Sequence, residues 1–276
     1  MKLALGVLVS HGFPAPSAFW DSLEQVKEHL RNGQTNDLLI EGGREPISGI
    51  RRIKTTSFPV DFARNEIVRD FLKGDEAYLF FMDADMTFPP DVVARLLLCD
   101  KPVVSARYHM RKPPYHAVAY VKHRTQVGPH CYAPVHWGQG CHEIERGGAG
   151  ALLIRRDVCQ AIQARIGENW FRYQRGPEPP HDYSVSEDFW FYQQAREAGF
   201  RCWLDWETEC EHLQEMGINR SWNEAYLDAQ VRDMAAMTPE ARQAALDALV
   251  CCGMPDGHRL ASGDLLSPYV YQPGER

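Results

Sequence analysis

The chain has 276 residues, of which 44% are hydrophobic, and its formal net charge is −7. This composition excludes wholesale disorder and argues against a protein that coats nucleic acid non-specifically, although a local basic groove is compatible with it. The N-terminal segment lacks the basic region and the long apolar run of a signal peptide, and no stretch approaches the ~20 apolar residues that a membrane span needs. We therefore expect a soluble, cytoplasmic protein without a membrane span.

Runs typical of strands and of amphipathic helices alternate along the N-terminal part of the chain. Residues 17–31 place Phe19, Leu23, Val26 and Leu30 on one stripe, which predicts a helix. Runs of strand length lie at residues 3–10, 37–41, 77–82 and 102–105, and further helices are predicted over 63–72, with Asp61 as a cap, and from Phe88-Pro89-Pro90-Asp91 onward. The alternation predicts an α/β protein with a mixed, mostly parallel sheet flanked by helices.

The middle of the chain, residues 107–146, is rich in proline, glycine, histidine and aromatic residues and has little periodicity. We expect hairpins and loops there, lying over the site. The later pattern predicts a strand over 151–154, a helix over 156–166, a loop over 167–186, a helix over 186–198, a last strand over 200–204 and a helix start at Thr238-Pro239-Glu240. We expect one domain over 1–217 and a helical C-terminal extension over 218–276 packed on it.

The chain has eight cysteines, without a CxxC pair and with irregular spacing, so most are expected to be free thiols. Cys131, His136, Cys141 and His142 form a loose cluster that offers zinc ligands, but it lacks the paired short spacing typical of zinc sites.

The pair of carboxylates in Asp83-Ala84-Asp85 follows the apolar run 77–82 directly. Such a run suits a strand buried on both faces of a sheet, and ligands of open parallel sheets bind beyond the carboxyl ends of the strands. Two carboxylates at that place are costly without a cation, and a hard divalent ion is their natural partner. Taken alone, the motif fits strand-end turn formers and helix caps equally well.

The segment LFFMDADMTFPPDVVARLL resembles the metal-binding segment of GT-A fold glycosyltransferases, of the family 2-like kind found in phage and prophage genomes. The resemblance covers about residues 3–217, and further similar motifs lie in the order that the family has. These motifs are Pro59-Val60-Asp61-Phe62-Ala63-Arg64-Asn65, Gly147-Gly148-Ala149-Gly150, Ser186-Glu187-Asp188-Phe189-Trp190 and the late His212. Each motif alone is weak, and the ordered set is what makes the resemblance specific.

The resemblance implies a GT-A (Rossmann-like) fold and a metal-dependent transfer from a nucleoside-diphosphate sugar, with UDP-sugar as the expected donor and Mn²⁺ or Mg²⁺ as the metal. It implies that Asp85 and His212 bind the metal, while Asp83 contacts the metal or the ribose. His212 stands in the acidic stretch Glu209-Cys210-Glu211-His212, so Glu211 is an alternative ligand, and a surface histidine is another reading.

By the same resemblance, Asp188 is the base that deprotonates the acceptor hydroxyl of an inverting enzyme, with Glu187 beside it. In a retaining enzyme Asp188 would orient the acceptor instead, and the pair can also simply cap a helix. The residues expected around the nucleotide sugar are Ser10, His11, Asp61, Arg64, Asn65, Asp83, Ala84 and Gly148. Arg64 is the candidate for the diphosphate, and a solvated helix position is its alternative reading.

Residues 101–142 contain no acidic residue and carry interleaved basic and aromatic side chains. The basic ones are Lys101, Arg107, Arg111, Lys112, Lys122 and Arg124, and the tyrosines are Tyr108, Tyr115 and Tyr120. This mixture favours a diphosphate, a polyanionic acceptor such as hydroxymethylated DNA, or a solvated hairpin that balances the acidic site. The acceptor is thus a glycan, a protein or a modified DNA base. Trp190, next to Asp188–Phe189, is a candidate to stack on a sugar ring.

Three other functions compete with this interpretation. A phosphohydrolase of the haloacid dehalogenase type would use Asp83 as nucleophile and Asp85 as acid/base, but its motif opens the domain, whereas two strand–helix units precede Asp83 here. A nucleotidyltransferase would need a glycine-rich basic loop after the first strand, which Ser10-His11-Gly12 lacks. A non-catalytic module would bind the nucleotide without turning over a donor.

Overall fold

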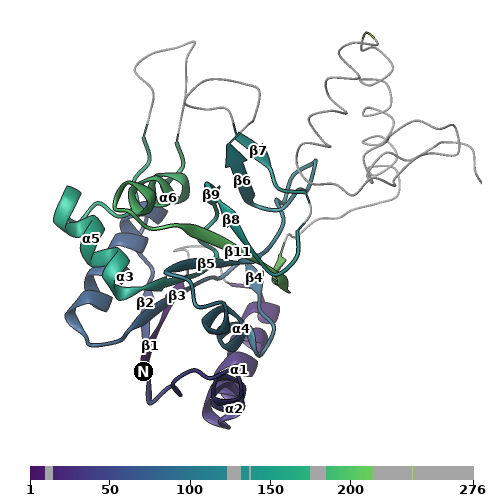
Figure 1. The fold of residues 1–276 in the computed structure, drawn as a ribbon, viewed down its shortest axis with the longest axis vertical. Helices are drawn as coiled ribbons and strands as arrows, with labels where there is room; N and C mark the ends of the chain where they lie inside the picture. Colours follow the sequence, from purple (N-terminus) through teal and green to yellow (C-terminus); the bar gives the residue numbers. More distant parts are fainter. Residues whose placement is uncertain (10–14, 123–131, 137, 175–184, 214–237, 239–276) are drawn as a thin grey trace, which may run out of the picture.

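The computed structural model describes residues 1–9, 15–122, 132–136, 138–174, 185–213 and 238. Seven strands form its main sheet (Figure 1). They are β1 (Lys2–Leu8), β2 (Gly49–Thr55), β3 (Tyr78–Asp83), β5 (Val103–Arg107), β8 (Cys141–Ile144), β10 (Ala151–Arg155) and β11 (Cys202–Glu209).

The main sheet has the order β2-β1-β3-β10-β5-β11-β8. Strands β2, β1, β3, β5 and β11 run in one direction, and β10 and β8 run against them. This mixed, mostly parallel sheet with helices on both faces confirms the predicted α/β class. Two small sheets accompany it, one of β4 (Met86–Thr87) and β12 (Glu211–His212), the other of β6 (Ala119–Lys122), β7 (Tyr132–Pro134) and β9 (Arg146–Gly147).

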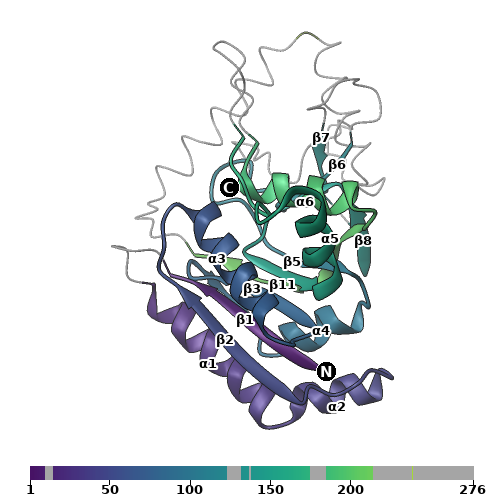
Figure 2. The same ribbon diagram turned by 90° about the vertical axis from the view of Figure 1, so that its left-hand side faces the viewer.

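Six helices cover the sheet in the part of the chain that the structure describes. They are α1 (Ser17–Arg31), α2 (Gln34–Glu41), α3 (Val60–Lys73), α4 (Val92–Leu98), α5 (Arg156–Ile166) and α6 (Glu187–Glu197). Helices α3, α5 and α6 pack on one face and α1, α2 and α4 on the other, so each face of the sheet has its own hydrophobic core (Figures 1 and 2). Among the described residues, no helix combines the length and apolarity needed to cross a bilayer.

The best-predicted elements are those with the strongest periodicity. Helix α1 has the predicted bounds, and its predicted stripe of Phe19, Leu23, Val26 and Leu30 is buried. Strand β3 is buried along its length up to Asp83, which explains why its apolar run is continuous rather than alternating.

The prediction of a strand at residues 37–41 is wrong, because these residues form the second half of helix α2. The strand that pairs with β1 is instead β2, whose sequence GIRRIKT was not recognised as a strand. It lies at the edge of the sheet, where the exposed Ile50, Arg52 and Lys54 alternate with more buried positions. A short apolar run fits a buried helix turn and a strand equally well, so only packing decides between them.

Three further predictions were corrected or fall outside the described residues. Asp61 does not cap α3, because the cap position is Pro59 and Asp61 lies in the first turn, accepting a bond from the Phe62 amide at 2.9 Å. The segment 107–146 forms the expected hairpins, but its strand β8 also joins the main sheet. The expected extension over 218–276, including the helix start at Pro239, lies outside the described residues except for Thr238.

Candidate functional site

The candidate site lies where β3 ends, at the carboxyl edge of the parallel strands. Asp83 is the last residue of β3, and the next residues turn into β4. Strand β4 pairs with β12 so that His212 lies opposite Met86, and the Leu213 amide donates to the Asp85 carbonyl at 2.7 Å. A contact between two very short strands therefore brings together residues 85 and 212, which the sequence analysis placed on one metal.

The side chains of Asp85 and His212 face each other. Nε2 of His212 lies 3.5 Å from Oδ2 of Asp85, and Nδ1 lies 2.9 Å from the carbonyl oxygen of His109. Because a carbonyl only accepts, Nδ1 carries a proton, and this bond turns the other ring nitrogen, Nε2, towards the carboxylate. An imidazole nitrogen and a carboxylate that face one another form a donor set suited to a divalent cation, with the backbone bond fixing the imidazole orientation.

Asp85 is held in its charged form. Burial alone would raise the pKa of this carboxyl group, but the hydrogen bond and charge of His212, together with the charge of Arg111, lower it. Nη1 of Arg111 lies 3.0 Å from Oδ2, the oxygen that also faces His212. Neighbouring Glu211 does not share this place, since its carboxylate accepts from the hydroxyl of Thr87 at 3.1 Å and is exposed.

Arg64 lies at the centre of the acidic groups rather than at the surface. Its side chain is only 2% exposed. Nη1 and Nη2 donate to the two oxygens of Asp83 at 3.0 and 2.8 Å, and Nε lies 3.4 Å from Asp188 and 3.7 Å from Glu187. A third bond goes to the carbonyl of Ala149 at 3.3 Å. The guanidinium expected to contact a diphosphate thus faces three carboxylates of the protein itself.

This arrangement distinguishes the two aspartates of the motif. Both oxygens of Asp83 are engaged by Arg64 in a two-pronged pair, whereas Asp85 faces His212 and a partly exposed arginine. A nucleophilic Asp83 would need an oxygen directed at substrate, so the pairing argues against the phosphohydrolase alternative. Asp85 is the carboxylate of the pair that faces His212 and Arg111.

Asp188 and Glu187 begin helix α6. Ser186 caps this helix by accepting from the Phe189 amide at 3.3 Å. Burial, and then the negative charges of Glu187 and Asp83, raise the pKa of Asp188 well above its usual range, although Arg64 opposes the rise. Oδ1 of Asp188 is buried without a hydrogen-bond partner among the described residues. The same oxygen faces Nε of Arg64 at 3.4 Å, so Asp188 belongs to the same cluster as Asp83.

The glycines of residues 147–150 allow the chain to pass close to this cluster. A Cβ added at Gly148 would lie 1.8 Å from the hydroxyl oxygen of Tyr108, and one at Gly150 would lie 3.2 Å from Oδ2 of Asp83. The same turn is tied down by Tyr192, which donates to the Gly148 carbonyl at 3.2 Å. The glycine-rich turn therefore serves close packing against the site.

The remaining predicted nucleotide residues form hydrogen bonds to other parts of the backbone. The amide group of Asn65 pairs with the backbone of Phe171 at 2.8 and 2.9 Å, which ties α3 to the loop after α5. Ala84 contributes a backbone amide to Leu8 at 3.1 Å. Ser10 and His11 lie outside the described residues.

Much of the basic and aromatic segment is paired within the protein. Lys101 lies over the ring of Trp203 at 4.3 Å, and Arg107 forms an ion pair with Glu209 at 2.6 Å. Lys112 and Lys122 are exposed, whereas Arg124 lies outside the described residues. On α6, the indole of Trp190 donates to the Asn169 carbonyl at 3.0 Å.

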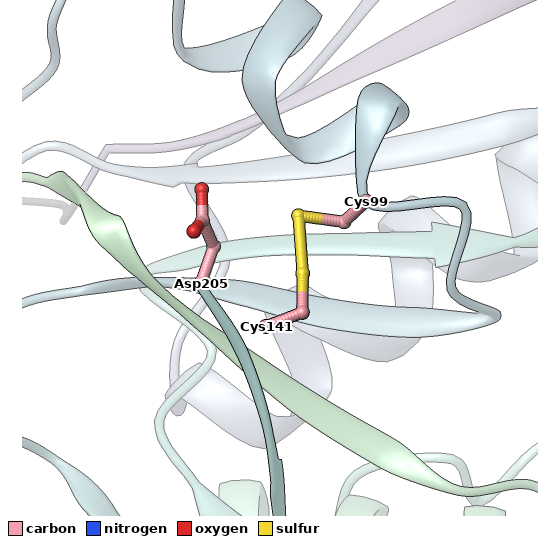
Figure 3. A group of neighbouring side chains, drawn as sticks. All are labelled: Cys99, Cys141 and Asp205. Atoms are coloured by element: carbon pink, nitrogen blue, oxygen red, sulfur yellow. A yellow bond between two sulfur atoms is a disulfide. The ribbon is translucent and has the colours of Figure 1, made fainter. Parts of the chain in front are cut away.

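The loose cluster of zinc ligands considered in the sequence is not formed among the described residues. Cys141 is joined to Cys99 in a disulfide between β8 and the end of α4, with Asp205 of β11 beside it (Figure 3). The disulfide leaves neither sulfur as a thiolate, and Asp205 already accepts from the Thr208 hydroxyl and the Glu207 amide. His142 points to the opposite face of β8 because side chains alternate along a strand. Cys159, Cys202 and Cys210 are free and buried, as predicted for most cysteines, and Cys131 lies outside the described residues.

Comparisons with known proteins give only distant likenesses. No family model and no curated protein matches the chain. Among solved structures, A197 from STIV is 14% identical with a TM-score of 0.43, covering 78% of this chain and 87% of that one. GalNAc-T7 with UDP, GalNAc and Mn²⁺ is 10% identical with a TM-score of 0.47, covering 90% of this chain and 55% of that one, so the match spans about half of its length. Likenesses this distant carry no inference about chemistry.

Proposed function

We propose that the chain is a metal-dependent glycosyltransferase that moves a sugar from a nucleoside-diphosphate sugar, with UDP as the expected nucleotide, to an acceptor hydroxyl. The observation that carries the proposal is the convergence of Asp85 and His212 at the carboxyl end of β3, with the Nδ1 bond to His109 turning the free nitrogen towards the carboxylate. The ordered motifs that resemble family 2-like GT-A enzymes supply the reaction class.

In this proposal, Asp85 and His212 hold Mn²⁺ or Mg²⁺. A bound metal supplies Lewis-acid stabilisation of the leaving diphosphate. Asp188 takes the proton of the acceptor hydroxyl through an inverting attack, and its burial keeps the pKa high enough for that task. Glu187 flanks it, and Arg64 fixes the orientation of Asp188 relative to Asp83. Each of these roles falls on a residue in direct contact with another member of the cluster.

The acceptor that we infer is polyanionic, such as hydroxymethylated DNA, ahead of a neutral glycan or a protein. Its support is the exposure of Lys112 and Lys122 on the segment that contains no acidic residue. The internal pairing of Lys101 and Arg107 reduces that support, because these two charges are already balanced.

The test is hydrolysis of a panel of nucleoside-diphosphate sugars with and without Mn²⁺, in which the release of the nucleotide is measured. We expect Asp85→Asn and His212→Gln to lose at least about a hundredfold in rate, the range typical of removing an electrostatic stabiliser of the transition state. Glu211→Gln is the matched control, because it lies next to His212 and faces Thr87. Full activity and metal dependence in Asp85→Asn would refute the proposal, as would turnover of a phosphomonoester in place of nucleotide sugars.

A further inference from the structure

A protein cation shares the proposed metal ligand. Arg111 approaches Oδ2 of Asp85 at 3.0 Å, and His212 faces this same oxygen from 3.5 Å. The Arg111 side chain is 46% exposed, so the solvent side of the pair is free for it to move. Arg64, the other arginine near the motif, is buried and fully committed to Asp83.

One hairpin carries both Arg111 and the carbonyl that orients His212. His109 pairs with Ala117, Val118 donates to the Tyr108 carbonyl at 2.9 Å, and Met110 donates to the His116 carbonyl at 3.0 Å. The base of this hairpin is fixed against the glycine-rich turn, because the Gly150 amide donates to the Tyr108 hydroxyl at 3.2 Å. Arg111 therefore extends to Asp85 from a fixed base, two residues beyond the His109 carbonyl.

We propose that Arg111 is a built-in counter-cation of Asp85, which competes with the metal ion for the carboxylate and moves to the diphosphate when the nucleotide sugar binds. The inference rests on the proposed function. A guanidinium and a divalent ion at one carboxylate oxygen repel each other, so either one weakens the binding of the other. A diphosphate beside the metal then provides the displaced guanidinium with an acceptor that it binds in a two-pronged manner.

This exchange predicts opposite effects of Arg111 on two ligands. Without nucleotide, Arg111 opposes the metal, so Arg111→Ala is expected to bind Mn²⁺ more tightly by roughly three- to tenfold, the range of a partly exposed ion pair. With saturating Mn²⁺, Arg111 helps the nucleotide, so the same variant is expected to bind UDP more weakly by a similar factor. Arg111→Lys keeps the positive charge but not the two-pronged guanidinium, so its Mn²⁺ and UDP affinities are expected to lie between those of the wild type and Arg111→Ala.

The experiment titrates Mn²⁺ into the full-length chain without nucleotide and follows the electron paramagnetic resonance signal of free Mn²⁺, then measures UDP binding by calorimetry at saturating Mn²⁺. Arg95→Ala is the matched control, because it removes an arginine of similar exposure whose ion pair with Asp91 lies on α4, away from the proposed site. Tighter Mn²⁺ binding and weaker UDP binding in Arg111→Ala, without change in Arg95→Ala, is the expected result.

Mn²⁺ affinity in Arg111→Ala that equals or falls below that of the wild type overturns the competition, and unchanged UDP affinity overturns the transfer to the diphosphate. The proposed function fails separately. If the wild type binds no Mn²⁺, or binds it equally well in Asp85→Asn, the metal site itself is refuted. If Mn²⁺ binding depends on Asp85 but not on Arg111, only the inference about Arg111 is refuted.

Discussion

Arg64 shows what a sequence reveals about a single residue and what it does not. The spacing of Ala63, Ile67, Val68 and Phe71 predicted the buried face of α3, and Arg64 adjoins that face. A buried guanidinium requires acidic partners. Its partners are Asp83, which lies 19 residues further along the chain, and Glu187 and Asp188 at the start of α6. These residues come together only in the folded chain.

The first prediction concerns Arg64→Met. This change leaves three buried or half-buried carboxylates without their shared cation, so we expect the free energy of unfolding to fall by about 3–5 kcal/mol. Removing one of these charges as well, in Arg64→Met/Asp83→Asn, should recover part of the loss. Urea denaturation followed by circular dichroism measures both variants.

Arg69→Met is the control for this prediction. Arg69 lies on the same helix and pairs with Glu168 at the surface at 2.6 Å, and such a pair contributes at most about 1 kcal/mol. Strictly additive costs of Arg64→Met and Asp83→Asn would contradict the account, because residues that share one ion pair are expected to show a coupling energy.

At the scale of elements, the helices and strands with a clear apolar pattern were predicted from the sequence, whereas a strand formed only through pairing with its neighbour was missed. Strand β3 and helix α1 carry patterns long enough to be unambiguous. Strand β2 carries three basic residues and is a strand because it pairs in register with β1. The convergence of residues 85 and 212 was expected from the resemblance alone, and the pairing of β4 with β12 supplies its physical cause.

The second prediction concerns the packing of the glycine-rich turn against the hairpin. In Gly148→Ala the new Cβ would lie 1.8 Å from the Tyr108 hydroxyl oxygen, so Tyr108 or the turn must shift. We expect a loss of stability of about 1–3 kcal/mol, as for other overpacked sites, and a loss of activity. Gly148→Ala/Tyr108→Phe removes the clashing oxygen and should recover part of the stability. A double variant as unstable as Gly148→Ala alone would show that the contact with the Tyr108 hydroxyl oxygen is not the cause of the instability.

The third prediction concerns the disulfide between α4 and β8. It joins two cysteines that are 42 residues apart in the sequence, and a disulfide typically contributes about 2–4 kcal/mol to the free energy of unfolding. Cys99→Ser/Cys141→Ser should therefore lower the midpoint of thermal unfolding. Adding a reductant should lower the midpoint of the wild type to that of the double variant and leave the double variant itself unchanged. A wild-type midpoint that does not respond to reductant would contradict this role.

At the scale of the whole molecule, two separate cores fix the sheet, and the acidic cluster lies at its carboxyl edge between helices of one face and the hairpins above. The α/β class followed from alternation alone. The position of the cluster followed from the rule that ligands bind beyond the carboxyl ends of parallel strands. The network of Arg64, Arg111 and Tyr108 did not, because each of these residues has an ordinary surface reading in the sequence.

The concentration of carboxylates at this edge has a cost for the fold. The pKa of Asp188 is raised in the folded state, first by burial and then by Glu187 and Asp83. A group with a raised folded pKa stabilises the protein below its unfolded pKa of about 3.9, and this contribution is lost as the pH rises through the folded value. Above its raised folded pKa, where the buried Asp188 is ionised, this group therefore opposes folding.

The fourth prediction follows from this sign. Asp188→Asn should abolish transfer to the acceptor by about 10²–10⁴-fold, the usual contribution of a general base, and yet raise the melting temperature at about pH 8. The gain should shrink towards about pH 3, where most of the wild-type carboxyl group is protonated in the folded and the unfolded chain alike. Thermal unfolding across this pH range measures it, with Asp37→Asn, an exposed position in α2, as the control. A variant less stable than the wild type at about pH 8 would mean that the attraction of Arg64 outweighs the burial of Asp188.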